Sequence, residues 1–306
     1  MTDQLPMRGV LAPVVTPFTA DLEPDLGRLI GHCHWLLSRD CGLAVFGTNS
    51  EGNSLSVKEK IELLNGLVAA GIDPARMMPG TGCCALPDTV RLTSHAVSLG
   101  CGGVLMLPPF YYKGVSDEGL YRAVAEVIER VGEAALRIYL YHIPPVAQVG
   151  FSLDLIERLI TDFPGTIAGI KDSSGDWDNT KAMLDRFPGW GVFAGNETVL
   201  LETLRHGGMG CISATCNINA PDIVALARHW REDGARERQA ACTALRARVQ
   251  AYPMIPALKG VIAHFAGDPD WRRMRPPLVA LDEAATAALG RELEAAGFAM
   301  PGLAAR

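Results

Sequence analysis

Residues 166–176 read Thr-Ile-Ala-Gly-Ile-Lys-Asp-Ser-Ser-Gly-Asp, and this stretch decides the fold. Its apolar run, 167–171, has the short and continuous hydrophobicity of a strand buried on both faces, which is typical of a parallel sheet. A polar loop follows, and the residues at 176–187 have the spacing of an amphipathic helix. The stretch therefore predicts one β/α unit whose strand ends on a lysine, Lys171.

The same unit recurs on both sides of this stretch. Strand-like apolar runs are expected at 9–16, 43–47, 77–80, 103–107, 138–143, 167–171, 191–194 and 210–214. Amphipathic helices are expected at 25–38, 56–70, 87–99, 117–131, 152–163, 176–187, 197–206 and 221–232. Serines suited to helix N-caps begin three of these helices, at Ser56, Ser116 and Ser152. Eight β/α units in about 225 residues predict an α/β fold, the (β/α)8 TIM barrel.

The remaining C-terminal segment has helical patterns only. They lie at 235–249, 254–265 and 283–296, and a Pro-rich turn at 275–278 separates the last two. We therefore expect a barrel at 1–232 and a C-terminal helical extension at 233–306, packed on the barrel or at a subunit interface.

Composition narrows the possible partners. The 306 residues carry a net charge of −6, so the chain has no excess of basic residues to neutralise nucleic-acid phosphates. No apolar stretch approaches the roughly 20 residues that a membrane helix needs. The N-terminus lacks the basic and apolar regions of a signal peptide. These observations predict a cytoplasmic protein that binds neither nucleic acid nor membrane.

Two motifs could indicate a bound metal or a dinucleotide. His32-Cys33-His34 lies in an expected helix, where residues two apart do not share a face, and no two of the eight cysteines form a C-x-x-C pair. We therefore expect no metal site and interpret the cysteines as buried thiols. The sequence at 80–85 matches G-x-G-x-x-A, but no helix begins within it and no acidic residue follows at 100–107.

Polar residues gather where the expected strands end. In a (β/α)8 barrel, catalytic groups lie at the carboxyl ends of the strands. Two tyrosines, Tyr139 and Tyr141, share one face of the strand at 138–143, beside the strand that ends on Lys171. The turn at 47–49, Gly-Thr-Asn, offers backbone N–H groups and a hydroxyl that suit a carboxylate. Together these residues predict a pocket for a 2-oxo acid.

Lys171 carries the chemistry of this pocket. Only six lysines occur beside 22 arginines, so a lysine on an apolar strand needs a particular reason. Burial disfavours the charged ammonium and is expected to lower its pKa, and a free amine attacks a carbonyl to form a Schiff base. A nearby tyrosine hydroxyl suits the proton transfers. Taken singly, the lysine could extend to solvent, the tyrosines could be core residues and the turn could be an ordinary loop.

Several of these motifs together resemble the dihydrodipicolinate synthase / N-acetylneuraminate lyase family. The resemblance rests on Gly47-Thr-Asn-Ser-Glu51, Pro109-Phe-Tyr111, Tyr141-His-Ile-Pro144 and Gly169-Ile-Lys-Asp172, with the segments at 9–18 and 275–278. It implies a homotetrameric class I aldolase that uses pyruvate and needs no cofactor. It also implies roles for particular residues: Lys171 forms the imine, Tyr141 is the general acid/base, and Thr48 relays protons. Tyr111 completes the relay by reaching into a neighbouring subunit's site.

The expected substrate-binding residues are Gly47, Thr48, Asn49, Gly195 and Ser213. One departure from the family pattern concerns the second substrate. Members that make dihydrodipicolinate usually carry an arginine where this chain has Val146, and a valine cannot bind a second carboxylate. The turn reads Thr-Asn-Ser where many members have Thr-Thr-Gly.

The expected activity is that of a lyase that joins or releases pyruvate and an aldehyde through Lys171. Three alternatives remain at this point: a 4-hydroxy-tetrahydrodipicolinate synthase, a dehydratase of 2-keto-3-deoxy sugar acids, and a barrel that binds a small acid without turnover. A pyridoxal-phosphate barrel is a further possibility, which a colourless purified protein would exclude.

Overall fold

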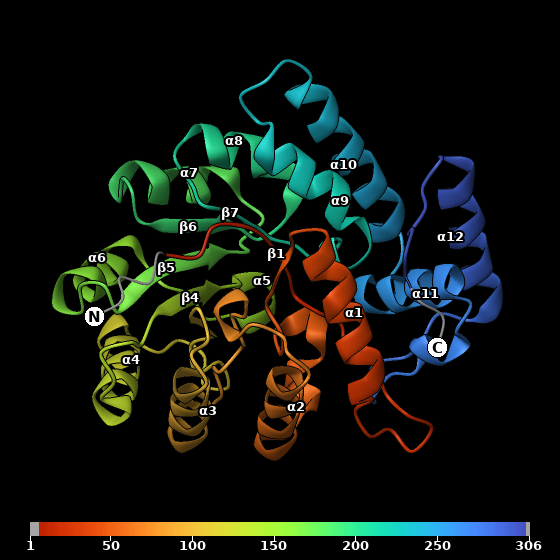
Figure 1. Cartoon of the computed structure of the whole chain (residues 1–306). Helices are drawn as coiled ribbons and strands as arrows, with labels where there is room; N and C mark the ends of the chain where they lie inside the picture. Colours follow the sequence, from red (N-terminus) through yellow and green to blue (C-terminus); the bar gives the residue numbers. More distant parts are fainter. Residues whose placement is uncertain (1–5, 304–306) are drawn as a thin grey trace.

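The computed structural model describes residues 6–303, and its centre is a parallel sheet of seven strands in the order β2-β1-β7-β6-β5-β4-β3. Figure 1 shows the sheet curling around a central axis with helices outside it. The strands are β1 (Gly9–Ala12), β2 (Gly42–Leu43), β3 (Val104–Met106), β4 (Ile138–His142), β5 (Ile167–Asp172), β6 (Gly191–Ala194) and β7 (Gly210–Ile212).

The predicted strand at 77–80 is reduced to two isolated bridges, so the prediction of a regular strand there was wrong. Met77 bridges to Leu43 of β2, and Gly80 bridges to Leu105 of β3, both in parallel orientation. Pro79 lacks the N–H that a regular ladder requires, although its carbonyl still accepts from Leu105 N at 2.9 Å. These bridges join the two edges of the sheet, and the expected (β/α)8 barrel is confirmed.

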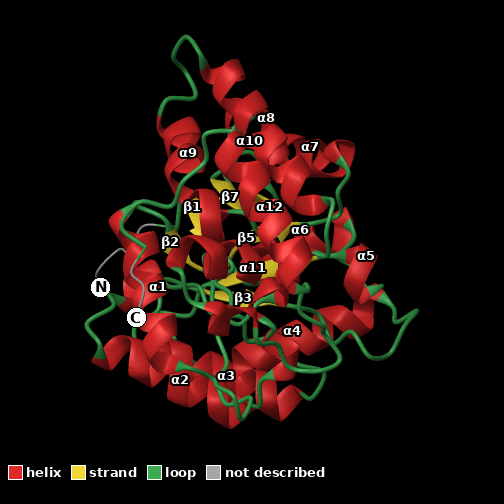
Figure 2. Ribbon diagram, turned by 90° about the vertical axis from the view of Figure 1, so that its right-hand side faces the viewer, coloured by secondary structure: helices red, strands yellow, loops and turns green. Residues whose placement is uncertain are grey.

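The helices form a layer around the strands, as Figure 2 shows with helices in red and strands in yellow. They are α1 (Leu26–Ser38), α2 (Val57–Ala69), α3 (Leu86–Ser98), α4 (Asp117–Val131), α5 (Pro144–Ala147), α6 (Leu153–Asp162), α7 (Trp177–Arg186), α8 (Leu200–Arg205), α9 (Cys216–Arg228), α10 (Ala235–Gln250), α11 (Met254–Ala266) and α12 (Glu283–Ala295). The 3-10 helices are η1 (Thr48–Ser50), η2 (Gly52–Ser54), η3 (Pro74–Arg76), η4 (Glu197–Val199) and η5 (Pro269–Arg272).

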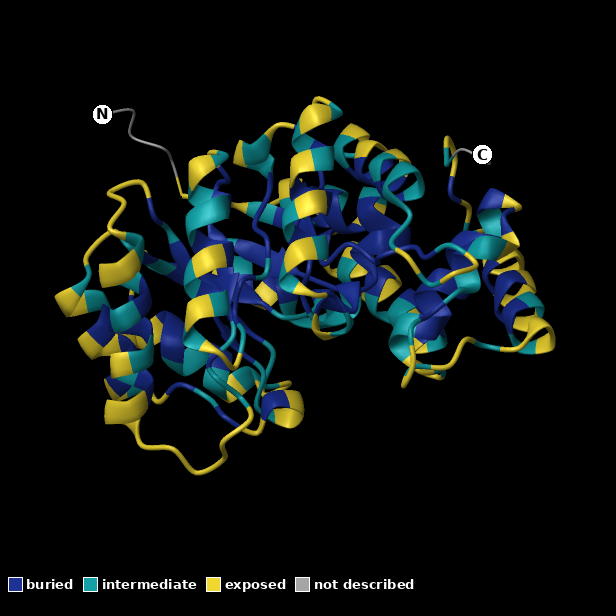
Figure 3. Ribbon diagram, turned by 90° about the horizontal axis from the view of Figure 1, so that it is seen from below, coloured by how far each residue is buried: buried dark blue, intermediate teal, exposed yellow. Residues whose placement is uncertain are grey.

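The predicted N-caps are present. Ser56, Ser116 and Ser152 each accept a hydrogen bond from a backbone N–H in the first turn of the helix that follows. Ser56 and Glu59 form a complete capping box at the start of α2. The buried faces of the helices point inward and the exposed faces outward, as Figure 3 shows from below.

Two helix predictions need correction. The helix expected at 221–232 is α9, which begins earlier and bends at Asn219, two residues ahead of Pro221. The prediction began the helix at Pro221 because proline is common in the first turn of a helix. Here the proline lies inside the helix, where it removes one backbone hydrogen bond and crowds the preceding turn. The helix expected at 197–206 divides into η4 and α8, whose boundary lies at Leu200.

The barrel interior is a small apolar cluster separate from the main core. It contains Leu11, Ala44, Met78, Leu105, Tyr139, Tyr141, Phe193 and Ile212. The larger core lies between the strands and the surrounding helices. Two tyrosines, Tyr139 and Tyr141, are thus packed inside the barrel, so that their phenol groups lie within its interior.

The C-terminal segment is helical, as expected, and packs on one side of the barrel. α10 contacts α9 and η4, and α11 contacts α9 and the turn η1. In Figure 1, α10 and α11 lie beside α9, and α12 lies further out, where it packs on α10 and α11. The extension therefore reaches the carboxyl end of the sheet through η1 and η4.

All eight cysteines are free thiols. Six are buried, Cys83 is half-buried and Cys84 is exposed. Within residues 6–303, no three metal-binding side chains are grouped so as to hold an ion. In the same part of the chain, every helix is too short or too polar to span a bilayer.

Candidate active site

Lys171 and Tyr141 meet at the carboxyl end of the sheet. β4 and β5 pair in parallel register with Tyr141 opposite Lys171, so both side chains enter the barrel from the same face. Lys171 Nζ lies 3.2 Å from the Tyr141 hydroxyl oxygen and 4.2 Å from the centre of its ring. Each residue is only 2% exposed. The amine therefore lies beside a phenol and away from bulk solvent.

Thr48 extends this contact by one hydroxyl. Its Oγ1 lies 3.1 Å from the Tyr141 hydroxyl oxygen, and either atom can donate. Three exchangeable groups, the Lys171 amine, the Tyr141 phenol and the Thr48 hydroxyl, thus form a continuous hydrogen-bonded chain. A proton can move along such a chain between the amine and the edge of the barrel.

The turn that carries Thr48 is a tightly bonded 3-10 turn, η1. The Gly47 carbonyl accepts from the N–H groups of Ser50 and Gly52, at 3.1 and 3.0 Å. A Cβ at Gly52 would overlap the carbonyl oxygen of Phe46, so only glycine fits at this position. Thr48 and Asn49 are half-buried at the tip of the turn. The turn therefore presents these two residues from a backbone that has little freedom.

The structure distinguishes the two tyrosines that the sequence placed on one face. The hydroxyl of Tyr139 accepts from the Met7 N–H at 2.9 Å, at the opposite end of the barrel. Burial raises the pKa of Tyr139. Tyr139 therefore closes the amino-terminal end of the barrel, and Tyr141 alone reaches Lys171.

His142 and Asp172, which follow Tyr141 and Lys171 in the chain, point away from the barrel interior and hold the ends of β4 and β5 in place. His142 lies opposite Asp172 in the parallel ladder, and its Nδ1 accepts from the Phe151 N–H at 3.1 Å. The Asp172 carboxylate accepts from Thr180 Oγ1 at 2.6 Å and from Asn179 Nδ2 at 3.1 Å, both on α7. Burial lowers the pKa of His142, and the Asp172 carboxylate opposes this shift. These contacts tie the end of β5 to α7 and the end of β4 to the loop before α6.

Tyr111 lies apart from this group. It is 73% exposed on the loop after β3, with Tyr112 edge-on against it at 5.4 Å between ring centres. Lys113, next in the chain, donates to the Ala147 carbonyl at 2.6 Å and so holds this loop to α5. The single chain therefore leaves the Tyr111 hydroxyl away from Thr48 and Tyr141.

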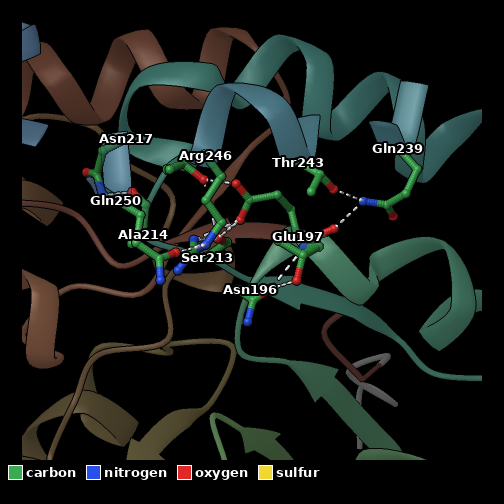
Figure 4. A network of polar contacts seen from close by, with 11 residues as sticks. Asn196, Glu197, Ser213, Ala214, Asn217, Gln239, Thr243, Arg246 and Gln250 are labelled. Carbon is green, nitrogen blue, oxygen red and sulfur yellow. Dashed lines mark hydrogen bonds and ion pairs between the residues drawn. The ribbon is translucent and has the colours of Figure 1, made fainter. Parts of the chain in front are cut away.

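Ser213 takes part in a buried polar network at the ends of β6 and β7, which Figure 4 shows from close by. Its hydroxyl donates to Glu197, and Thr215 donates to the other carboxylate oxygen. Arg246 of α10 donates to the same carboxylate at 3.1 Å and to Ser213 Oγ at 3.3 Å. Gln239, also on α10, donates to the Glu197 carbonyl at 2.8 Å. The network attaches the C-terminal extension to the rim of the barrel.

Gly195 lies between the exits of β5 and β6. A Cβ at this position would overlap the Ser173 side chain and the Asp172 carbonyl oxygen. The glycine therefore lets the two strand exits lie close together beside Lys171.

Sequence reasoning missed two other buried lysines, Lys60 on α2 and Lys259 on α11, and the second of these forms an ion pair. Lys259 Nζ donates to Glu51 Oε1 at 2.7 Å and to the Thr16 carbonyl at 2.9 Å, and neither charged side chain is exposed. A signal for it existed: Lys259 is one of only six lysines, and it lies in an apolar helical stretch at 254–263. Arg246 was also missed, because a single basic residue within a helix has no distinctive pattern.

Comparison with known proteins identifies the family to which the chain belongs. The pattern of the dihydrodipicolinate synthetase family matches residues 6–296. An "Uncharacterized DapA-like lyase" of Chloroflexus aurantiacus is 32% identical over 288 residues, which cover 92% of this chain and 94% of that protein. A 4-hydroxy-tetrahydrodipicolinate synthase of Moorella thermoacetica is 31% identical over 221 residues, which cover 72% of this chain and 74% of that one.

Solved structures give the same result. A dihydrodipicolinate synthase of Agrobacterium tumefaciens superposes with a TM-score of 0.87 at 32% identity, over 94% of this chain and 99% of that one. YagE of E. coli K12, a member of the dihydrodipicolinic acid synthase family solved in complex with pyruvate, gives a TM-score of 0.86 at 26% identity, over 95% and 99%. The chain belongs to the dihydrodipicolinate synthetase family of lyases.

Proposed function

We propose that this lyase uses Lys171 to form a Schiff base with pyruvate and that it makes or breaks a carbon–carbon bond with an aldehyde. The observation that carries the proposal is the contact between the Lys171 amine and the Tyr141 hydroxyl, 3.2 Å apart inside the barrel rim. A buried amine beside a phenol has the two groups that imine formation requires, a nucleophile and a proton carrier.

The first stage is formation of the imine. The turn at 47–49 takes the pyruvate carboxylate, and the ketone carbon then faces Lys171. The neutral amine attacks this carbon to give a carbinolamine. Tyr141 delivers a proton to the carbinolamine hydroxyl, which leaves as water, and Thr48 passes a proton to the phenolate that remains, which restores the phenol.

The second stage is carbon–carbon chemistry. The protonated imine withdraws electrons, so the methyl carbon loses a proton and becomes the nucleophilic end of an enamine. That carbon adds to the aldehyde carbonyl, whose oxygen takes up a proton, and hydrolysis of the imine releases a 4-hydroxy-2-oxo acid. The reverse sequence cleaves the same acid to pyruvate and an aldehyde. No further cofactor enters this proposal.

The second substrate differs from the one that dihydrodipicolinate synthases bind. Val146 is 62% exposed on α5, at the position where those enzymes usually carry arginine. An exposed valine offers no charge-assisted hydrogen bonds to a carboxylate. This observation favours an aldehyde without a second carboxylate at that point over the 4-hydroxy-tetrahydrodipicolinate synthase reaction.

Borohydride trapping tests the imine. Pyruvate and borohydride together should leave a stable adduct on Lys171, detected by peptide mass spectrometry, and none on Lys259, which is buried but ion-paired. A protein without an adduct, or with one elsewhere, would contradict the proposal.

Product analysis then separates the remaining reactions. An aldolase releases pyruvate from a panel of 4-hydroxy-2-oxo acids, whereas a 2-keto-3-deoxy acid dehydratase consumes its substrate without releasing pyruvate. A barrel that only binds a small acid retains pyruvate affinity after Lys171→Ala and turns over no member of the panel.

The assembly that we propose is a homotetramer in the cytoplasm, formed from barrels at 1–232 with their extensions at 233–306. The support is an exposed apolar surface, made by Tyr111, Tyr112 and Val115 on the loop after β3 and by Val146 on α5. A second copy on this surface would cover the two tyrosines and could bring Tyr111 to the neighbour's Thr48. Sedimentation of the purified protein measures the assembly directly, and replacing both tyrosines with serine should weaken it.

A further inference from the structure

The turn that carries Thr48 is held from behind by the C-terminal extension. Glu51 follows the turn directly, in a left-handed conformation with φ 54° and ψ 33°, and its N–H donates to the Thr48 carbonyl at 3.1 Å. Its side chain leaves the substrate side of the turn and accepts from Lys259 Nζ at 2.7 Å. Glu51 therefore links the turn that carries Thr48 to Lys259 on α11, which lies 208 positions after Glu51 in the chain.

The contacts around this ion pair form a closed ring. Lys259 also donates to the Thr16 carbonyl at 2.9 Å, and Thr16 Oγ1 donates to the Ser50 carbonyl at 2.7 Å. Ser50 precedes Glu51, so the ring returns to the turn from which it started. The Lys259 ammonium lies 4.6 Å from the ring centre of Phe18, which covers it on another side. Three segments, the exit of β1, the turn η1 and the helix α11, are thus tied at one point.

A second cation holds the outer side of the same loop. The Arg275 N–H donates to the remaining Glu51 oxygen at 3.3 Å, and its guanidinium donates to the carbonyls of Leu22 and Ser54 at 2.8 and 2.7 Å. It also donates to Glu59 in the first turn of α2, and this contact lowers the pKa of Glu59 to about 2. The loop from Thr48 to Glu59 is therefore braced by the extension along its whole length.

The buried Lys259–Glu51 ion pair is not explained by stability alone. Burial of two charges carries a large desolvation cost, and replacement of a buried pair by apolar residues is often neutral or stabilising. The Lys259–Glu51 pair has no exposed charged atoms, so that cost applies in full. An apolar pair could not fix the orientation of residue 51. The Glu51 carboxylate does so because it accepts hydrogen bonds from the Lys259 ammonium and from the Arg275 N–H.

We infer that Lys259 is a positioning residue of the active site: through Glu51 it sets the orientation of the turn at 48–50 and so the binding of the pyruvate carboxylate. This inference rests on the proposed function, because it assigns the carboxylate to that turn. Lys259 contacts no reacting atom. Its effect reaches the chemistry through Thr48, whose hydroxyl lies 3.1 Å from the hydroxyl of Tyr141.

The experiment compares stability with pyruvate saturation in three variants. Lys259→Met removes the ammonium and keeps most of the stem, Lys259→Met with Glu51→Leu replaces the pair by apolar groups, and Glu51→Gln keeps the shape of the carboxylate. Lys181→Met, at a partly exposed lysine of α7, is the matched control. The readouts are thermal unfolding and the pyruvate concentration that half-saturates borohydride trapping at Lys171.

The expected result separates the two readouts. Lys259→Met should raise the half-saturating pyruvate concentration by about 10-fold or more and should lower stability. The double variant should recover stability but keep the raised pyruvate requirement, since the turn has lost its directional anchor. Glu51→Gln should fold, because it keeps the shape of the side chain, and it should raise the half-saturating pyruvate concentration by less than Lys259→Met does. The Lys181→Met control should match the unmodified protein in both readouts.

Two failures are distinguishable. If the unmodified protein forms no adduct with pyruvate, the proposed function fails. If it forms the adduct and the folded double variant or Glu51→Gln saturates at the same pyruvate concentration as the unmodified protein, the positioning role alone is overturned.

Discussion

Three lysines are buried in the described part of the chain, and two of them invite comparison: Lys171 at the barrel rim and Lys259 in the C-terminal extension. Both are almost fully excluded from solvent, and each ammonium lies over an aromatic ring, Tyr141 at 4.2 Å and Phe18 at 4.6 Å. They differ in their polar partners. Lys259 meets a carboxylate at 2.7 Å, whereas the hydrogen bond recorded for Lys171, in the described part of the chain, goes to a phenol.

The difference in partners separates a nucleophile from a structural cation. A carboxylate favours the charged ammonium, which has no lone pair with which to attack a carbonyl. Burial lowers the pKa of Lys259, and Glu51 opposes that shift. A phenol brings no negative charge at neutral pH, and it can exchange protons with an amine. Burial alone therefore does not identify a catalytic lysine, and the group beside it does.

The largest effect should follow the loss of Lys171. Lys171→Ala is expected to abolish the borohydride adduct and to lower turnover by about 10⁴-fold or more, because the covalent intermediate cannot form. Lys181→Ala, at a partly exposed lysine on the outer helix α7, is the control and should keep full activity. An adduct that moves to Lys259 in the variant would break the comparison, since it would show the ion-paired lysine acting as a nucleophile.

Removal of the phenol should give the next largest effect. Tyr141→Phe keeps the ring over Lys171 but removes the hydroxyl, and turnover should fall by roughly 10²–10⁴-fold if that hydroxyl transfers protons. Tyr139→Phe is the matched control, because its hydroxyl lies at the opposite end of the barrel against Met7. Steady-state rates of pyruvate release measure both. Equal rates in the two variants would remove Tyr141 from the mechanism.

The stability of the Lys259 region should follow the rules for buried ion pairs. Lys259→Met alone is expected to cost about 3–5 kcal/mol of unfolding free energy, since Glu51 would remain buried without its main partner. Addition of Glu51→Leu should recover most of this loss. Urea unfolding monitored by circular dichroism measures both variants. A single variant as stable as the unmodified protein would show that the pair is not effectively buried.

A buried histidine, His32, extends the comparison, because the stability of the protein should depend on pH through its imidazole. Among residues 6–303, His32 has no ion pair and no hydrogen bond to a phenol; its Nε2 lies 3.3 Å from Asn217 Oδ1, and burial lowers its pKa from 6.5 to about 4. Between these two values the unfolded chain binds a proton that the folded chain does not. Folding should therefore lose roughly 3 kcal/mol from this residue as the pH falls from 6.5 to 4, and none of it above pH 6.5.

His32→Gln tests this dependence. The variant should reduce the loss of stability between pH 6.5 and 4, whereas His34→Gln, at an exposed position on the same helix, should leave it unchanged. Urea unfolding at several pH values gives the slopes. Identical slopes in all three proteins would contradict the assignment to His32.

The elements were predictable to different degrees. The strand with Lys171 and the helices capped by Ser56, Ser116 and Ser152 were recognised, because periodicity and capping are local. The strand at 77–80 was overestimated, since Pro79 permits isolated bridges but not a ladder. The early start of α9 was missed because Pro221 indicates a helix start in most sequences.

The residues of the candidate site also differ in how far the sequence could predict them. Alternation placed Tyr139 and Tyr141 on one face but could not select between them, because residues two apart share a face along the whole strand. The family resemblance pointed to Tyr141, and the parallel register gives the physical reason, because it sets Tyr141 opposite Lys171. The pairs Lys259–Glu51 and Arg246–Glu197 join residues 208 and 49 positions apart, and no local pattern marks them.

The amino-acid order by itself determined that this protein is a barrel of β/α units with a lysine at the end of one strand, since hydrophobic periodicity and strand ends are written within a few residues. The tertiary structure alone decided which tyrosine meets that lysine and which lysine is neutralised by a carboxylate. The physical reason is distance. Proton transfer and ion pairing act over about 3 Å, and only the folded chain brings distant residues that close.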